Sequence, residues 1–326
     1  MMFIIQAFCY KHILFIFIVI CYIVACLYTS WQILPQGILR RKNWKKLSRE
    51  KNGKENYFLI PNFDFCKYHF GNVTTGKTLL IFILSKADHY ENRREIRSTW
   101  GKNVVVNDVS ILHIFVVGVS SNHTKQVFAE NYEYSDILMF NITDEYESLT
   151  NKTSLVIIWI YKHCPQANYA FKTDDDVFVR IDLISSLIRS LPLNGVYAGT
   201  CTNISKPIRY YNANFPKIHS KWVVKTHEYK EEYYPPYCRG IGYILSYDVI
   251  KFLQSKVFKV PFFRLEDVYI GMCLNKVYTF MNFHRYARDL HYIRKGIPKN
   301  FLKGYALIHG TSPKQQKKFC KMYCKN

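Results

Sequence analysis

The sequence predicts an α/β protein with a mostly parallel sheet and helices on both of its faces. Two largely apolar segments, Thr78–Leu84 and Ile111–Val119, are typical of strands buried on both sides. Strand-like and helix-like segments alternate along the chain, which implies strand–helix–strand units. A further strand-like segment, Tyr169–Val179, carries three consecutive aspartates at 174–176. Ligands of such sheets bind at the carboxyl ends of the strands, where these aspartates are expected.

The amino-terminal part predicts a membrane protein. Residues 13–34 hold no charged side chain and are long enough to cross a bilayer as a helix. We expect an uncleaved signal-anchor after a short tail at 1–12; a cleaved signal peptide is the alternative, although no convincing small-x-small site follows. Residues 35–76 are basic, contain several Pro and Gly, and predict a stem. The folded domain is then expected at 77–326.

Two signals disagree about which side of the membrane holds this domain. Lys11 precedes the span and five basic residues follow it, which favours the cytoplasm by the positive-inside rule: Arg40, Arg41, Lys42, Lys45 and Lys46. Five Asn-x-Ser/Thr sequons after the span favour the secretory lumen: Asn72, Asn122, Asn141, Asn151 and Asn203. Seven of the ten cysteines also follow the span, consistent with an oxidising compartment, and their odd number leaves at least one outside any internal disulfide. We follow the sequons and expect a lumenal domain.

The formal net charge of +21 suggests an anionic partner. The chain contains no helix-turn-helix, zinc-finger or RNA-recognition pattern, so we expect no nucleic acid. A cytosolic nucleic-acid-binding protein stays as an alternative that rests on charge and reversed topology. The apolar fraction of 49% excludes a disordered chain.

Within the domain, periodicity and turn residues predict the following elements in order. Helices are expected at Tyr90–Trp100 with Gly101 as C-cap, near Thr124–Asn131, and at Leu149–His163, with a strand at Asp136–Asn141. The second half is less regular. It predicts a helix at Ile181–Leu191, a strand at Val196–Gly199, and loops with a hairpin at 205–239. A glycine turn with a strand is expected at Gly240–Ser246, and a short helix after the acidic pair Glu266–Asp267.

The three aspartates have a chemical meaning of their own. Adjacent carboxylates repel one another and resist burial, so a fold that places them at the end of a central strand needs a compensating cation. Mn²⁺ or Mg²⁺ with oxygen ligands fits, and such an ion can hold a diphosphate. A solvated acidic turn is the alternative.

Five motifs occur in an order that resembles the β-1,3-galactosyltransferase family, which also holds β-1,3-N-acetylglucosaminyltransferases. They lie at 94–101, 146–153, 172–179, 234–243 and 266–271. The resemblance covers about 78–320 and implies a GT-A fold, which is a Rossmann-like mostly parallel sheet with helices on both faces. It also implies a UDP-sugar donor, Mn²⁺, inversion at the sugar carbon, and a single-pass type II protein of the Golgi membrane.

The resemblance also implies roles for individual residues. The last aspartate, Asp176, is the expected direct metal ligand, and Asp174 and Asp175 are expected to face the ribose and sugar of the donor. Asp267 is the expected base that removes the proton of the acceptor hydroxyl; an N-cap role is the alternative. His309, which follows a late apolar run, is expected to complete the metal site. His284 and His291 are weaker alternatives for that ligand.

A further set is expected to bind the nucleotide sugar. Arg94, Arg97 and Lys152 suit the phosphates, because basic side chains match phosphate oxygens; solvated helix charges are the alternative. Gly240 and Gly242 would let the backbone approach the sugars closely, with turn geometry as the alternative.

The function expected from the sequence is transfer of galactose from UDP-galactose to a glycan on a glycoprotein or glycolipid, with a new β-1,3 bond. Arg239, Ile241 and the segment 202–228 depart from the family pattern, so the donor and acceptor sugars are not carried over. UDP-N-acetylglucosamine is the alternative donor, and a non-catalytic carbohydrate-binding relative is the alternative function. We expect the sequon at Asn151 to be unused, because a glycan there would obstruct the site.

Overall fold

The computed structural model describes residues 57–71, 73, 76–210, 220–274, 280–282, 287–289 and 304–324, all within the second of two units, Lys54–Asn326. The predicted tail, the span at 13–34, most of the stem, Asn72, His284 and His291 lie outside the described residues. No helix in the described part is long and apolar enough to cross a membrane.

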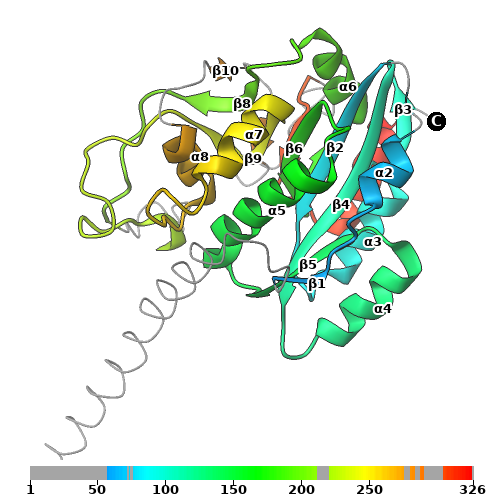
Figure 1. Ribbon diagram of the computed structural model, residues 1–326, viewed down its shortest axis with the longest axis horizontal. Helices are drawn as coiled ribbons and strands as arrows, with labels where there is room; N and C mark the ends of the chain where they lie inside the picture. The colour runs from blue at the N-terminus through cyan, green and yellow to red at the C-terminus, as the bar shows by residue number, and fades with distance from the viewer. Residues whose placement is uncertain are drawn as a thin grey trace, which may run out of the picture. The chain divides into compact units, whose positions relative to one another are not determined.

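In the described part, nine strands form one mixed sheet (Figure 1). Its order is β1-β5-β4-β2-β6-β9-β8-β10, with β3 paired to β4. The strands are β1 (Phe58–Ile60), β2 (Lys77–Leu84), β3 (Val104–Val106), β4 (Val109–Val119), β5 (Ile137–Thr143), β6 (Tyr169–Asp174), β8 (Tyr197–Thr202), β9 (Tyr237–Ser246) and β10 (Phe280–Asn282). The central strands β5, β4, β2 and β6 are parallel, as predicted, whereas β9 is antiparallel to both of its neighbours.

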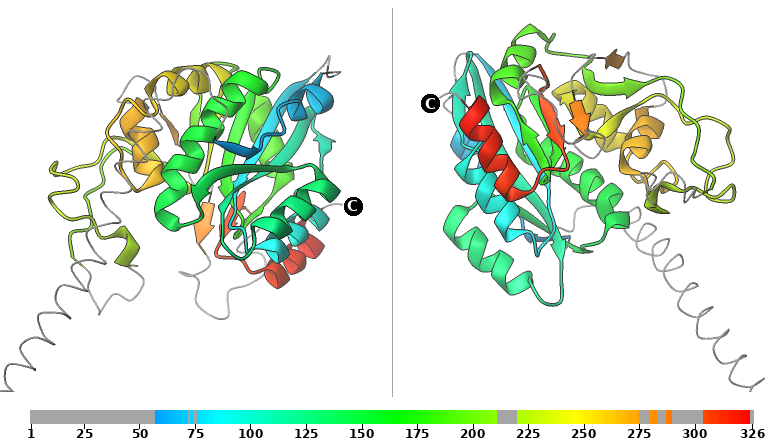
Figure 2. Two further views of the ribbon diagram at one scale, coloured as in Figure 1. Left: turned by 60° about the horizontal axis from the view of Figure 1, so that its bottom comes forward. Right: turned by 180° about the vertical axis from the view of Figure 1, so that it is seen from behind.

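Helices cover both faces, so the predicted α/β class is confirmed. On one face lie α3 (Tyr90–Ser98), α6 (Ile181–Ser190) and α9 (Pro313–Tyr323), and on the other lie α5 (Leu149–His163) and α7 (Tyr247–Lys256) (Figure 2). Two more helices, α4 (Thr124–Tyr134) and α8 (Glu266–Leu274), follow β4 and precede β10, respectively. The four helices predicted from periodicity in the first two thirds of the domain are all present, with their ends shifted by no more than three residues.

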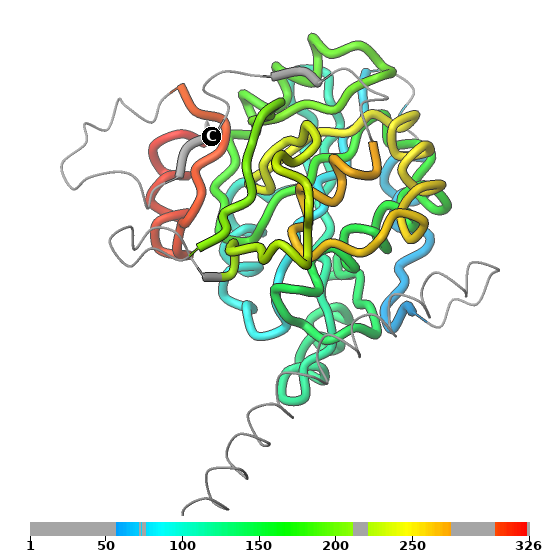
Figure 3. The backbone as a smooth tube through the Cα atoms, turned by 90° about the vertical axis from the view of Figure 1, so that its left-hand side faces the viewer, coloured from blue at the N-terminus to red at the C-terminus, as the bar shows by residue number. Residues whose placement is uncertain are grey.

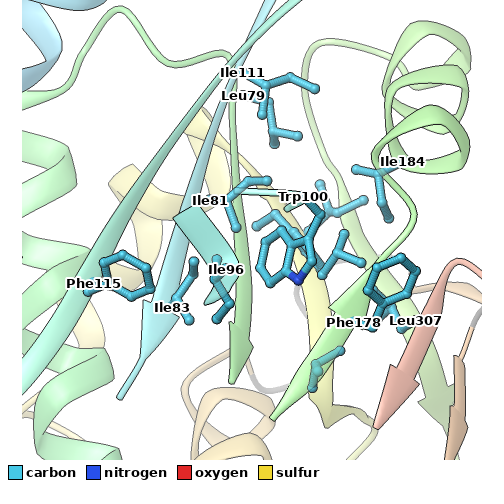
Figure 4. Close-up of a cluster of buried hydrophobic side chains, with 14 of the residues drawn as sticks. Leu79, Ile81, Ile83, Ile96, Trp100, Ile111, Phe115, Phe178, Ile184 and Leu307 are labelled. Carbon is cyan, nitrogen blue, oxygen red and sulfur yellow. The ribbon is translucent and has the colours of Figure 1, made fainter. Parts of the chain in front are cut away.

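The main core lies between β2, β4 and β6 and the α3–α6–α9 face. Trp100, Ile96 and Ile184 are buried against β-sheet side chains such as Ile81 and Phe115 (Figure 4). Burial of side chains this large stabilises the fold by about 1.5–3 kcal/mol each. This core fixes the carboxyl ends of the parallel strands, and therefore the position of the aspartates.

The end of the predicted stem is folded onto the domain. Strand β1 pairs with β5, helix α2 (Phe65–Phe70) follows it, and a disulfide joins Cys66 to Cys164 at the end of α5. The folded domain therefore begins before the predicted boundary at residue 77. The reason is that a short apolar run and one cysteine are enough to dock a segment whose composition resembles a linker.

Two further disulfides, Cys201–Cys238 and Cys320–Cys324, leave Cys273 as the free cysteine among the described residues. The first of these joins β8 to β9. The chain from β9 to α8 (yellow to orange) lies together at one end of the molecule, as Figure 3 shows. The second half of the chain thereby brings α8 to the same edge of the sheet as the aspartates.

Candidate active site

The Asp triplet lies where the sequence predicts, at the carboxyl end of β6. Asp174 is the last residue of β6, pairs with Leu84 at the end of the parallel strand β2, and is followed by a turn into β7 (Val177–Val179). The three carboxylates turn in different directions. Two of them face solvent-accessible space, and Asp175 is buried.

Asp176 lies next to His309. A second small sheet, β11 (Ala287–Asp289), β12 (Leu307–His309) and β7, sets His309 opposite Val177. Thr311 donates from its backbone N–H and its hydroxyl to the Asp176 carbonyl, at 2.8 Å each. As a result, the His309 Nε2 atom lies 3.4 Å from the Asp176 carboxylate, and the two side chains are 22% and 43% exposed.

Asp174 belongs to a second set of charges that meets at Lys172. The Lys172 ammonium donates to Asp174 at 2.8 Å and to the carbonyl of Gly240 at 2.5 Å, and it lies 3.7 Å from Glu266. The backbone N–H of Gly240 donates to the Asp267 carboxylate at 3.0 Å. Asp174 and Asp267, which are far apart in sequence, are therefore joined through one lysine and one glycine.

Burial dominates the electrostatics of this set. It raises the pKa values of Asp174, Glu266 and Asp267, against the lowering effect of the Lys172 charge. Burial acts on the pKa of Lys172 in the lowering direction, but the charges of Asp174 and Glu266 outweigh it and the pKa is raised. Lys172 therefore stays charged, whereas the carboxylates around it are easier to protonate than usual.

Aromatic side chains surround Asp267. Burial and the charge of Asp267 raise the pKa of Tyr146 to about 12 and also raise that of Tyr237. The Lys221 ammonium lies 4.5 Å from the centre of the Tyr146 ring, and Arg264 donates to the carbonyls of Lys221 and Val223. Arg264 thus ties the segment that contains Trp222 to the start of α8.

Asp175 is not placed as expected. Its carboxylate accepts hydrogen bonds from the Ser85 hydroxyl at 2.7 Å and from His89 Nδ1 at 2.8 Å. The side chain is 8% exposed and contacts the loop after β2. Asp175 is therefore engaged inside the protein, and we do not assign it to the donor.

The three basic residues expected at the phosphates also lie elsewhere. Arg97 makes two hydrogen bonds to Asp136 at 2.7 and 2.8 Å and an ion pair with Glu130 at 2.8 Å. Lys152 is buried, ion-paired with Asp144 and hydrogen-bonded to the carbonyl of Ser85. These two side chains are held inside the protein by carboxylates of α4, of the loop before β5 and of the loop after β5.

Arg94 differs, because it is 57% exposed and pairs with Glu91 on its own helix. This is the solvated helix charge that the sequence left as the alternative. The buried arginine of α3 is its neighbour Arg93, which pairs with Glu130 at 2.6 Å and donates to the Ser85 hydroxyl at 2.9 Å.

The two glycines serve different purposes. A methyl group at Gly242 would lie 2.6 Å from Leu307 and 2.9 Å from Phe171, so this position is small because the core is packed against it. A methyl group at Gly240 would lie 3.5 Å or more from its neighbours, Asp267 and Lys172 among them, which are ordinary contacts. Only Gly240 faces the site.

Lys172 is the functional residue to which the sequence analysis gave no role. The sequence did indicate the contact between Lys172 and Asp174, because side chains two apart on a strand lie on the same face and Asp174 follows Lys172 by two residues. The contacts of Lys172 with Gly240 and Glu266 could not be predicted from the sequence, because they depend on the pairing of β6 with β9.

Comparison with known proteins identifies the family of the chain. A family model described as Galactosyltransferase matches residues 91–281. The chain is 32% identical over 225 residues to β-1,3-galactosyltransferase 5 of Homo sapiens, covering 68% of each protein. It is also 32% identical over 211 residues to β-1,3-galactosyltransferase 1 of Mus musculus, covering 63% of this chain and 62% of the relative.

Among solved structures, the galactosyltransferase LgtC with donor and acceptor sugar analogs aligns over 76% of this chain and 97% of that chain. The identity is 11% and the TM-score 0.36, which is too low to carry an argument. The matches in sequence are sufficient by themselves to identify the family. The protein is a glycosyltransferase, and the chain belongs to the galactosyltransferase family.

Proposed function

We propose that this enzyme transfers galactose from UDP-galactose to a glycan acceptor with inversion, forms a β-1,3 linkage, and depends on a divalent metal. One observation carries the proposal: Asp267, the expected base, is hydrogen-bonded through Gly240 and Lys172 to the carboxylate that ends β6. A donor-side carboxylate and a base on a separate helix are thereby held at one place. The relatives named above favour galactose over N-acetylglucosamine.

The donor side has a pair of side chains that suits Mn²⁺. No group of three or more His, Cys, Asp or Glu side chains in the described part of the chain is arranged to hold a metal alone. Asp176 and His309 are nonetheless adjacent and partly exposed, and a carboxylate with an imidazole is a fitting donor set. These two residues would hold the ion, with the donor diphosphate and water as further ligands. The bound ion would stabilise negative charge on the departing UDP.

The acceptor side is formed around Asp267. A base must be ionised to take the proton of the attacking hydroxyl, and it works best when its pKa is near the operating pH. Burial raises the pKa of Asp267 toward that range, while hydrogen bonds from Gly240 and Val268 hold the carboxylate in place. The aromatic rings of Tyr146 and Tyr237 provide apolar surface beside it, on which a sugar ring can lie.

The cellular setting is part of the proposal. We propose a single-pass type II protein of the Golgi membrane, anchored by residues 13–34, with this domain in the lumen. Three disulfides and three exposed sequons support the lumenal side: Asn122, Asn141 and Asn203. Asn151 lies in α5 and its sequon partner Thr153 is fully buried, which supports the expectation that it carries no glycan.

The test is UDP release by the purified domain from Lys54 onward, with Mn²⁺, a panel of UDP-sugars and β-linked acceptors. We expect acceptor-dependent release with UDP-galactose that falls by about 10²–10⁴-fold in Asp267→Asn, the usual contribution of a general base. Asp248→Asn is the matched control. Asp248 also lies in the first turn of a helix and accepts hydrogen bonds from a glycine N–H, that of Gly195.

The outcomes separate the alternatives. Release with UDP-N-acetylglucosamine alone would overturn the proposed donor and leave the chemistry intact. If Asp267→Asn and Asp248→Asn kept equal activity, Asp267 would not be the base. UDP binding without turnover on any acceptor would favour the carbohydrate-binding alternative.

A further inference from the structure

Lys172 occupies an unusual position for a lysine. It lies in the interior strand β6, its side chain is 2% exposed, and its ammonium has three neighbours from three different elements. These are Asp174 at the end of β6, the carbonyl of Gly240 in β9, and Glu266 at the start of α8. Burying an ammonium is costly unless its charge is compensated. Here two carboxylates lie within 4 Å of it, and it makes two hydrogen bonds.

The backbone of Gly240 makes hydrogen bonds to both sides of the site. Its carbonyl accepts from Lys172 at 2.5 Å, and its N–H donates to Asp267 at 3.0 Å. A shift of this residue would therefore move the hydrogen bond that orients Asp267. Tyr243, also in β9, donates to Glu266 at 2.5 Å and fixes the adjacent residue of α8.

We propose that Lys172 is a positioning residue that holds Gly240, and through it the base Asp267, in register with the donor-side carboxylate Asp174. The inference rests on the proposed function, because it requires Asp267 to be the base. Lys172 does not touch the sugars in this role. It replaces mobile water and ions by one fixed internal cation, so that the acceptor side is already arranged before a substrate binds.

The charge of Lys172 gives the proposal a measurable consequence. The titratable groups that interact with Asp267 are Lys172 of β6, Glu266 of α8, and five tyrosines: Tyr146, Tyr197, Tyr234, Tyr237 and Tyr243. The tyrosines are neutral at working pH because their pKa values are raised. The positive charge of Lys172 therefore favours the ionised form of Asp267.

The experiment is the pH dependence of kcat/KM for the acceptor in the wild type, Lys172→Met and Lys172→Arg. Loss of the cation disfavours the ionised base, so the acid limb of Lys172→Met should move to higher pH by about one unit. Its kcat/KM at neutral pH should fall by about 100-fold, because the Gly240 peptide is no longer held. In Lys172→Arg the charge remains, so the acid limb should stay, while the altered geometry lowers kcat/KM by about 10-fold.

Lys77→Met is the control for general destabilisation. Lys77 starts β2, at the end of the strand away from the aspartates, and donates to the carbonyls of Ile188, Arg189 and Leu191. Its removal should lower the melting temperature without moving the acid limb. An acid limb in Lys172→Met that coincides with the wild type would overturn the inference.

The inference can be tested even if Lys172→Met does not fold. In that case Lys172→Arg decides: full wild-type kcat/KM would show that the three contacts of the ammonium do not matter and would overturn it. Failure of the proposed function looks different, because then the wild type would release no UDP or Asp267→Asn would remain active.

Discussion

Two clusters of charged side chains in this domain differ in the balance of their positive and negative charges. The α3 cluster consists of Arg93, Arg97, Glu130 and Asp136, two cations and two anions joined by short ion pairs. The site cluster consists of Lys172, Asp174, Glu266 and Asp267, one cation against three anions. Next to it, Asp176 adds a further carboxylate beside His309.

The net charge of a buried cluster helps to distinguish a structural role from a functional one. Burial of charges is costly, so a cluster that only supports the fold should be neutral overall, as the α3 cluster is. A cluster with excess negative charge is tolerated where it serves a ligand or a reaction, and its pKa values are perturbed accordingly. The excess negative charge of the site cluster is what the proposed metal-dependent transfer requires, and the α3 cluster has no such excess.

The largest expected effect is on the stability of the α3 cluster. Arg97→Met leaves Asp136 without its guanidinium partner, while Glu130 keeps its ion pair with Arg93. The lost guanidinium also lies 4.8 Å from the Phe115 ring centre and 4.1 Å from that of Tyr134. We expect the free energy of unfolding to fall by about 3–5 kcal/mol, the usual consequence of breaking a buried ion pair. Denaturant unfolding measures it.

Arg94→Met on the same helix is the control for this variant, because its ion pair with Glu91 is exposed. It should cost no more than about 1 kcal/mol. Equal losses in the two arginine variants would show that the α3 cluster does not support the fold, and the comparison of the two clusters would fail.

Substitutions at the two glycines of β9 compare a position packed in the core, Gly242, with a position that faces the site, Gly240. Gly242→Ala forces a methyl group against Leu307 and Phe171 and should destabilise the domain by about 1–3 kcal/mol. Gly240→Ala meets ordinary contacts in the protein, so it should fold normally and lose acceptor turnover if a sugar approaches this backbone. Thermal unfolding and UDP release distinguish the two. A Gly240→Ala enzyme with unchanged KM for the acceptor would place the sugars elsewhere.

The pH dependence of stability should have opposite signs in the two clusters. Burial acts to raise the pKa of Asp136, but hydrogen bonds and charges of Arg97 and His113 outweigh it and the pKa is lowered. Asp136 therefore stabilises the fold above its unfolded pKa, and this contribution is lost as pH falls through the folded value. The pKa of Glu266 is raised by burial, so its contribution is present below the unfolded pKa and lost as pH rises through the folded value.

Unfolding free energies of Asp136→Asn and Glu266→Gln, measured from pH 3 to pH 8, check these signs. The deficit of Asp136→Asn relative to the wild type should shrink toward pH 3. Relative to the wild type, Glu266→Gln should become more stable as pH rises. Parallel curves for both variants would mean that the two clusters do not differ in the way proposed.

The smallest effect on stability is expected at Asp176. Its side chain is 43% exposed, so solvent screens its ion pair with His309. The free energy of unfolding should change by no more than about 0.5 kcal/mol, as for ordinary surface substitutions. Transferase activity should nevertheless be lost if Asp176 holds the metal. A large loss of stability would instead identify Asp176 as a structural turn residue.

The sequence predicted the site where local pattern was sufficient. The strand before Asp174, the helix that begins at Glu266, and the late strand ending at His309 are all local features, and the structure contains each of them. The ion pairs of Arg97 and Lys152 could not be predicted, because their partners Asp136 and Asp144 lie in the loops before and after β5, whose contacts follow from packing. A charged side chain on a helix looks the same in sequence whether it pairs with a carboxylate or awaits a phosphate.

The pairing of the strands could also be predicted only in part from the sequence. Parallel pairing of β2, β4 and β6 follows from the alternation of strands and helices. The antiparallel insertion of β9 beside β6 does not, and it is this pairing that brings Gly240 to Lys172.

Mn²⁺-dependent binding of UDP, measured by calorimetry in the wild type and in Asp176→Asn, tests most directly whether the excess of carboxylates serves a metal-bound donor. We expect UDP to bind the wild type only when Mn²⁺ is present and to bind Asp176→Asn weakly under the same conditions. Asp248→Asn should bind like the wild type. UDP binding that is equally tight with EDTA, or that is unchanged in Asp176→Asn, would contradict the assignment of Asp176 to the metal and the donor.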